Sequence, residues 1–270
     1  ATIIAWASTL LPAEWTSTPW HPLLACALFI VPGVPLINFV DDMLDNYIQV
    51  GIVRAVNTLL MVAAMAFGIA FAVKLCHIEN FFPTISMVPH HQYWEYAIAA
   101  AISAMGFSMI FNIQRRLLWV VAIGGIIAVC TRNFVNLGPS TDNIGLDMGL
   151  VIGSFSGAVL VSLIAIKAVH WFHVPNHVLT IPSVIPMIPG VLMYRMLFGI
   201  ININVQSIDQ VTPLMKAIES GVNSGLVIMC IALGVAIPNI FGRRFIASSK
   251  NKRLAELLKE RKARGKFVEW

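Results

Sequence analysis

The sequence predicts an all-α polytopic membrane protein, and three observations lead to this class. Apolar residues make up 58% of the 270-residue chain, whereas charged residues make up only 11%. A soluble globular chain carries roughly a quarter charged residues. Several apolar runs approach or exceed the ~20 residues that a membrane-spanning helix needs. The runs are unevenly spaced and lack alternating polarity, which argues against an outer-membrane β-barrel.

Hydropathy predicts the spans in chain order. The segment 41–54, DDMLDNYIQVGIVR, is short and polar and is expected at the membrane interface. The remaining apolar runs predict a partial helix to about residue 11 and spans at about 22–38, 55–75, 93–113, 117–134, 145–167, 177–198 and 220–241.

Positive charge is concentrated at the carboxyl end. Residues 242–270 hold ten Lys or Arg and three Glu, a net of +7, so the other residues sum to −2 within the total of +5. The positive-inside rule makes this tail cytoplasmic. Residues 250–270 are predicted to form a short, charged helix that anchors the topology near anionic headgroups, and a partner-binding site is the alternative. The basic balance therefore does not indicate nucleic-acid binding.

Two spans contain prolines beside a glycine. The stretch 181–194 reads IPSVIPMIPGVLMY, and the span at 22–38 is interrupted by PGVP at 32–35. Each proline inside a helix costs about 3 kcal/mol. Broken backbone at membrane depth is tolerated only where it is buried in protein or lines a wet cavity. Broken spans in transporters present helix ends to a substrate, and packing kinks are the alternative explanation.

The two interrupted spans predict an internal repeat. FIVPGVPLIN (29–38) and PMIPGVLMYR (186–195) share P-G-V after an Ile-containing apolar pair, with their prolines at 32 and 189, 157 positions apart. Opposite directions in the membrane make this an inverted repeat, as in many secondary transporters. The expected units are the last three spans of a first repeat (1–76), a five-span second repeat (93–241) and a basic cytoplasmic tail (242–270). Applying the same offset to residue 93 predicts about 65 further residues of membrane domain before Ala1.

The residues around the first motif resemble a known family. The run P-G-V-P-L-I-N-x3-D-x8-G-x2-R, at 32–54, is similar to the signature of the threonine/serine exporter family. Residues 93–241 resemble that family's second membrane domain, and in some bacteria the two domains resemble separate subunits of a two-component succinate exporter. The family tends to carry Gly where this chain has Asn46, a residue that tolerates left-handed backbone. The family's amino-terminal portion is absent, so activity housed there is not assigned to this chain.

Charged groups at membrane depth are the first candidates for transport chemistry. Asp42 is expected to bind an ammonium group or carry a coupling proton, and Arg54 to bind a carboxylate. An interfacial cap and ion pair is the alternative for both residues. The full set of expected substrate-binding residues is Pro32, Gly33, Asn38, Asp42, Arg54, Pro186, Pro189, Gly190 and Tyr194.

Other polar residues are given structural interpretations. Asp147 and Glu95 are expected at the interface, Asn112 and Asn223 between helices, and Tyr194 either at substrate or in an aromatic belt. The cysteines, which are far apart, and the His pair at 90–91 lack metal-site spacing. No metal or cofactor is expected.

The resemblance and the repeat together predict a secondary exporter in the cell inner (plasma) membrane. Threonine and serine are the expected substrates, exchanged against protons by alternating access, and a dicarboxylate such as succinate is the alternative. A non-transporting scaffold subunit is a further alternative, and an enzyme is not expected. The expected partners are the small-molecule substrate, membrane lipid and the missing amino-terminal portion, with a homo-oligomer left open and no nucleic acid.

Overall fold

The computed structural model describes residues 33–75, 92–139, 144–172, 174–201 and 211–263. All regular elements in these segments are helical. In chain order they are α3 (Gly33–Leu44), α4 (Ile48–Leu75), α5 (Tyr93–Ile110), η1 (Arg115–Leu117), α6 (Leu118–Asn136), α7 (Leu150–Phe172), α8 (Asn176–Val184), η2 (Ile185–Met187), α9 (Gly190–Ile201) and α10 (Val211–Ala263).

Four of the described helical segments are long and apolar enough to cross a membrane. They are Ile48–Gly68, Arg115–Asn136, Leu150–Val169 and Leu214–Gly242. A fifth candidate is the pair formed by Asn176–Met187 and Gly190–Met196, which together would form one span that is bent by 54° at the break between them. The protein is therefore an all-helical multi-pass membrane protein with four or five candidate spans among its described residues.

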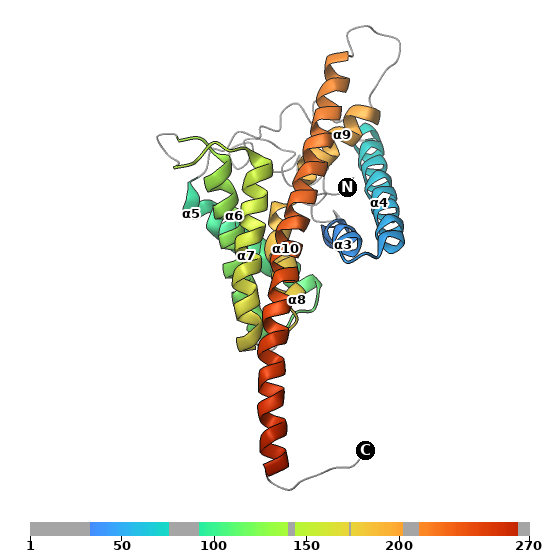
Figure 1. Ribbon diagram of the computed structural model, residues 1–270. Coiled ribbons are helices and arrows are strands. Elements are labelled where there is room, and N and C mark those ends of the chain that lie inside the picture. The colour runs from blue at the N-terminus through green and yellow to red at the C-terminus, as the bar shows by residue number, and fades with distance from the viewer. Residues whose placement is uncertain (1–32, 76–91, 140–143, 173, 202–210, 264–270) are drawn as a thin grey trace.

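Helices α5, α6, α7 and α10 form one packed bundle (Figure 1). Small residues allow close approach, as expected where lipid provides no hydrophobic force between helices. A Cβ added to Gly157 would lie 2.6 Å from the backbone oxygen of Ala128, and one added to Gly234 would lie 2.7 Å from the Cβ of Ala158. Side chains larger than hydrogen would push α7 away from α6 and α10.

The proline-containing segment and α3 complete the core of this bundle. Ile37 and Val40 of α3 share one buried cluster with Val184 and Met187. The same cluster includes residues of α6, α7 and α10, among them Ala128, Val129, Ala158, Val161, Val227 and Ile231. The chain segments before and after residue 92 therefore share one apolar core.

The two ends of the bundle differ. At one end α10 continues well beyond its neighbours (Figure 1). We call this end the tail side; it holds η1 and the junction between α7 and α8. The opposite end, the far side, holds the start of α5, the end of α6 and the start of α7 (Figure 1).

Three predicted elements differ from the structure. Segment 41–54 is not a separate piece, because it is divided between α3, which runs to Leu44, and α4, whose candidate span begins at Ile48. Helix α5 forms where a span is predicted but is not among the candidate spans, since Glu95 and three aromatic residues in its first turn lower its hydropathy. The tail does not begin a separate helix at 250, because α10 is continuous to Ala263.

Candidate functional site

The two Pro-Gly motifs meet in space. Gly33 is the first residue of α3 and is buried, and a Cβ added to it would lie 2.5 Å from Cδ1 of Ile188. Ile185 lies next in line, at 3.7 Å. The start of α3 therefore rests against the residue immediately before Pro189. Pro32 lies outside the described residues, so the break expected at the first motif is described only from Gly33 onward.

The second motif coincides with the bend between α8 and α9. Pro182 lies inside α8, and Pro186 lies in η2. Helix α9 begins at Gly190, directly after Pro189. Instead of helical bonds, the backbone N–H of Ile188 donates to the carbonyl of Ile185 at 3.0 Å, and that of Gly190 donates to Ile188 at 2.9 Å. Prolines have no N–H to continue the helical pattern, which explains why the helix turns here.

A cavity of about 440 Å³ lies on the tail side of this crossing. Val34, next to Gly33, and Pro182, before the bend, line it where the two motifs approach. Exposed residues of the connection between α5 and η1 line its outer part. The complete lining is Val34, Phe111, Asn112, Ile113, Gln114, Leu117, Val174, Pro175, His177, Val178, Ile181 and Pro182.

Three polar side chains line the otherwise apolar cavity. Asn112 has left-handed backbone, with φ 52°, where the chain turns after α5. Gln114 accepts a bond of 2.7 Å from Nε of Arg116, and His177 lies in the first turn of α8. A small number of polar groups in an apolar wall is typical of small-molecule sites. The sequence analysis missed His177. In the sequence it is only a polar residue near Pro175 at the end of a predicted span, which does not distinguish it from other residues at span ends.

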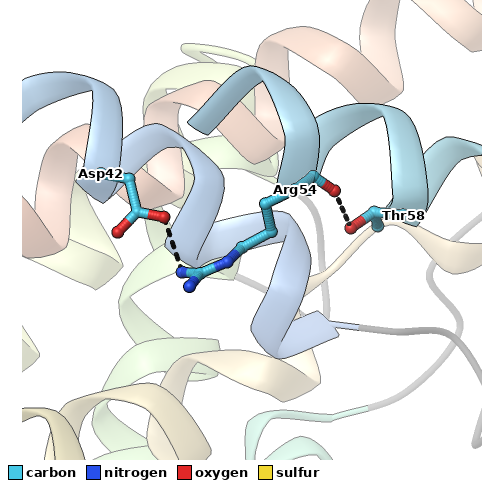
Figure 2. Close-up of polar contacts among 3 residues, drawn as sticks. All are labelled: Asp42, Arg54 and Thr58. Atoms are coloured by element: carbon cyan, nitrogen blue, oxygen red, sulfur yellow. Dashed lines mark hydrogen bonds and ion pairs between the residues drawn. The ribbon is translucent and has the colours of Figure 1, made fainter. Parts of the chain in front are cut away.

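Asp42 and Arg54 form an ion pair at the corner between α3 and α4. Nη1 of Arg54 lies 2.7 Å from Oδ2 of Asp42 (Figure 2). The side chains are 38% and 24% exposed for Arg54 and Asp42, respectively. Thr58 donates to the backbone carbonyl of Arg54 at 2.7 Å one turn further along α4. The pair joins the end of one helix to the start of the next.

The same corner explains two other residues of the 32–54 motif. Asn46 has φ 69°, the left-handed backbone expected for the position where glycine is common. A Cβ on Gly51 would lie 2.9 Å from the backbone oxygen of Phe39 and 2.6 Å from Cγ of Met43. Much of this motif therefore has a role in holding α3 against α4.

The expected site residues do not form one cluster. Asp42 follows Gly33 by nine positions in α3, so about 14 Å of helix separates the ion pair from the crossing. Tyr194 is only 1% exposed, which does not fit an aromatic belt at the lipid surface. Asn38, Pro186 and Pro189 are half-buried.

Four polar residues that were given structural interpretations can be compared with their positions in the structure. Glu95 caps α5 by accepting a bond of 3.0 Å from the backbone N–H of Gln92. Asp147 is exposed and precedes α7, with φ 53°. Asn112 lies at the cavity and not between helices, whereas Asn223 is half-buried on α10. The histidines at 90–91 lie outside the described residues.

The sequence analysis also passed over Arg132, which lies inside the candidate span Arg115–Asn136. Its signal is simple: it is an arginine within an apolar run, which is costly in a membrane. The next residue, Asn133, is only 5% exposed.

Comparison with known protein families agrees with this architecture. A family model described as "Threonine/Serine exporter, ThrE" matches residues 96–241, which include the second motif and most of the cavity. A second model, described as "Putative threonine/serine exporter", matches residues 1–76, which include the first motif. No solved structure matches the chain. With both motifs and more than half of the chain inside these matches, the protein belongs to the threonine/serine exporter family.

Proposed function

We propose that the protein is a secondary exporter of small polar metabolites, with threonine and serine as substrates and the proton gradient as the driving force. The observation that carries the proposal is the cavity that lies beside the start of α3 and the proline-containing helix α8. A volume of about 440 Å³ suits a small metabolite, since ligand sites range from about 300 to 1,000 Å³. The family match supports export as the direction.

In this proposal the tail side is cytoplasmic and the cavity is the loading site. Asn112, Gln114 and His177 offer donors and acceptors to the polar groups of an amino acid. The contact between Gly33 and Ile188 closes the path beyond the cavity. Moving the 32–54 and 176–201 segments relative to the bundle would open that path toward the far side, as alternating access requires.

An inverted repeat is part of this proposal. Two P-G-V motifs that approach each other, one at the start of α3 and one at the start of α9, are the arrangement expected where repeats meet at a central site. Asp42 is the proposed coupling group, because its partly exposed side chain is paired with Arg54 at the corner between α3 and α4. Protonation of Asp42 would release the Arg54 guanidinium and loosen the corner between α3 and α4.

Counterflow in proteoliposomes tests the proposal. Vesicles loaded with unlabelled threonine should accumulate labelled threonine and serine through the reconstituted protein, with succinate as a parallel substrate. An imposed pH gradient should change the accumulated level if protons are coupled. Exchange of succinate alone would move the proposal to dicarboxylate export, and no exchange of any of the three would overturn transport of these metabolites.

Cysteine labelling tests the cavity as the loading site. Cys26, Cys76, Cys130 and Cys230 are first replaced by Ala, and Gln114→Cys is introduced at the cavity. Threonine should slow modification of this variant by a membrane-impermeant thiol reagent applied from the tail side. Lys167→Cys, which is exposed and outside the lining, is the matched control and should show no protection. Equal rates with and without substrate at both positions would contradict a loading role.

A further inference from the structure

We propose that Arg132 and Asn133 form a carboxylate-binding site on the far side of the bundle. The site is distinct from the cavity, because Arg132 follows the tail-side end of α6 at Leu118 by fourteen residues, or about 21 Å of helix. The inference rests on the proposed export function for its biological meaning. The binding itself is argued from the two side chains and their surroundings.

Arg132 lies on the core-facing stripe of α6. Ala128 and Val129, one turn earlier, belong to the buried cluster, and Asn133 beside it is also buried. On the α7 side, a Cβ added to Gly153 would lie 2.6 Å from the backbone oxygen of Arg132, so the two helices touch at this level. Arg132 is half-buried at this contact between α6 and α7.

The guanidinium of Arg132 is not neutralised within the described residues. No described carboxylate forms an ion pair with it. Its Nε and Nη2 each donate to Oδ1 of Asn133 at 3.3 Å, which are long bonds for a charged donor. An arginine has five N–H groups, so this amide oxygen satisfies only part of the set. A charged group inside a span normally finds a partner or serves a pathway.

Asn133 supplies a second, independent sign of a missing ligand. Its side chain is 95% buried, since only 5% of its surface is exposed, and its Nδ2 has no hydrogen-bond acceptor. A buried donor without an acceptor destabilises the fold, so such groups are rare in folded proteins. The Arg132 bonds hold the amide oxygen beside the guanidinium, which leaves the amide N–H₂ free for a third group.

A carboxylate fits both sets of donors. It is planar, carries negative charge and has two oxygens, so it can accept from the guanidinium and from Nδ2 of Asn133 together. Threonine, serine and dicarboxylates all share this group. In an exporter, a carboxylate that leaves the crossing between Gly33 and Ile188 would meet this site on its way out.

The test measures binding separately from transport. Purified protein in detergent micelles is heated with threonine, threoninamide, succinate or inorganic phosphate. Threonine and succinate should raise the melting temperature, and threoninamide, which lacks the carboxylate, should not. A rise with phosphate but not with the carboxylates would mean that a phosphate group such as a lipid headgroup is the occupant and would overturn the proposal.

Two variants identify the residues responsible. Arg132→Gln should weaken carboxylate binding by roughly tenfold to a hundredfold, the range for a hydrogen bond to a charged group. Asn133→Asp places a carboxylate beside Arg132, so it should fold and should also prevent binding of an external one. Lys167→Gln removes an exposed charge from α7 and should bind as the unmodified protein does.

The outcomes separate this inference from the proposed function. If the unmodified protein exchanges threonine or succinate and the Arg132 and Asn133 variants still bind it with unchanged affinity, the carboxylate site is wrong and export stands. If carboxylates bind through Arg132 but no substrate is exchanged, the site stands and the proposed function fails. Arg132→Lys, which keeps the charge but not the planar fork, should retain weak binding if the geometry of the guanidinium matters.

Discussion

At the scale of single residues, the corner between α3 and α4 shows why particular side chains occur in the 32–54 motif. Asn46 takes left-handed backbone, and Asp42 and Arg54 join the two helices through an ion pair of 2.7 Å. Each of these three residues is therefore explained by the local geometry of the corner. The transport role proposed for Asp42 is additional to this structural role.

Asn46 should tolerate glycine but not a branched residue. Asn46→Gly keeps the left-handed φ of 69° at no steric cost, so the melting temperature should be unchanged or slightly higher. Asn46→Val should destabilise the fold by about 1–2 kcal/mol because β-carbon branching clashes in this region. Thermal unfolding in detergent micelles measures both, and equal stability of the two variants would contradict the left-handed assignment.

The ion pair should contribute modestly to stability. A double-mutant cycle with Asp42→Asn and Arg54→Gln should give a coupling energy of about 0.5 kcal/mol, and no more than about 1 kcal/mol, because both side chains are partly exposed. The coupling should fall as salt is raised. A coupling of several kcal/mol would show that the pair is more buried than its 38% and 24% exposures indicate.

At the scale of helices, glycine positions determine which surfaces can approach. Gly51 faces the backbone of α3, whereas Gly68 on the same helix has no atom within 4 Å of an added Cβ. The first allows the α3–α4 contact, and the second lies on an open face of α4. The two positions therefore form a natural pair for testing the packing.

Gly51→Ala should separate α3 from α4 and lower stability by about 1–3 kcal/mol, since the added methyl meets a backbone oxygen that cannot rotate away. Gly68→Ala is the matched control and should be neutral or slightly stabilising because alanine favours the helix. Melting temperatures measure both. Equal melting temperatures for the two variants would contradict the close contact between α3 and α4 at Gly51.

At the scale of the whole molecule, the central feature is that the start of α3 contacts the bend between α8 and α9. Gly33 and Ile188 are 155 positions apart in sequence, yet they share this contact. The contact brings together the regions matched by the two family models.

This contact predicts a cross-link. With the native cysteines replaced, Gly33→Cys and Ile188→Cys should form a disulfide under mild oxidation, because the added Cβ at 33 reaches the side chain at 188. The cross-link should stop substrate exchange, and reduction should restore it. Gly68→Cys with Ile188→Cys is the control and should not cross-link. Full substrate exchange by the oxidised, cross-linked protein would contradict the proposal that residues 33 and 188 separate during transport.

Much of the fold could be predicted from the sequence, because helix formation in a membrane follows from local composition. Spans in α4, α6, α7 and α10 arise where apolar runs are long, and the bend at Pro189 arises where three prolines interrupt one. The boundary at Ile48 and the continuity of α10 to Ala263 were predicted wrongly. The first error came from assigning charged residues to an interface, and the second came from starting a new helix at 250 where helical hydrogen bonds continue.

The candidate site was predictable only in part. The Pro-Gly motifs and the Asp42–Arg54 pair can be found from residue types and spacing. His177 and Asn112 carry no such signal, because they matter only through a cavity built from three separate segments. Arg132 was visible as a charge in an apolar run, but its lack of a described carboxylate partner depends on which helices surround it.

The sequence by itself determined that this protein is helical and membrane-embedded, because the length and polarity of each run decide whether its backbone can satisfy its hydrogen bonds in lipid. It also located the bend at Pro189, where prolines interrupt an apolar run. Only the tertiary structure decided that Gly33 meets Ile188, that a cavity forms beside α3 and α8, and that Asn133 is buried with an unused donor. These features depend on contacts between distant segments, and such contacts follow from packing of the whole chain.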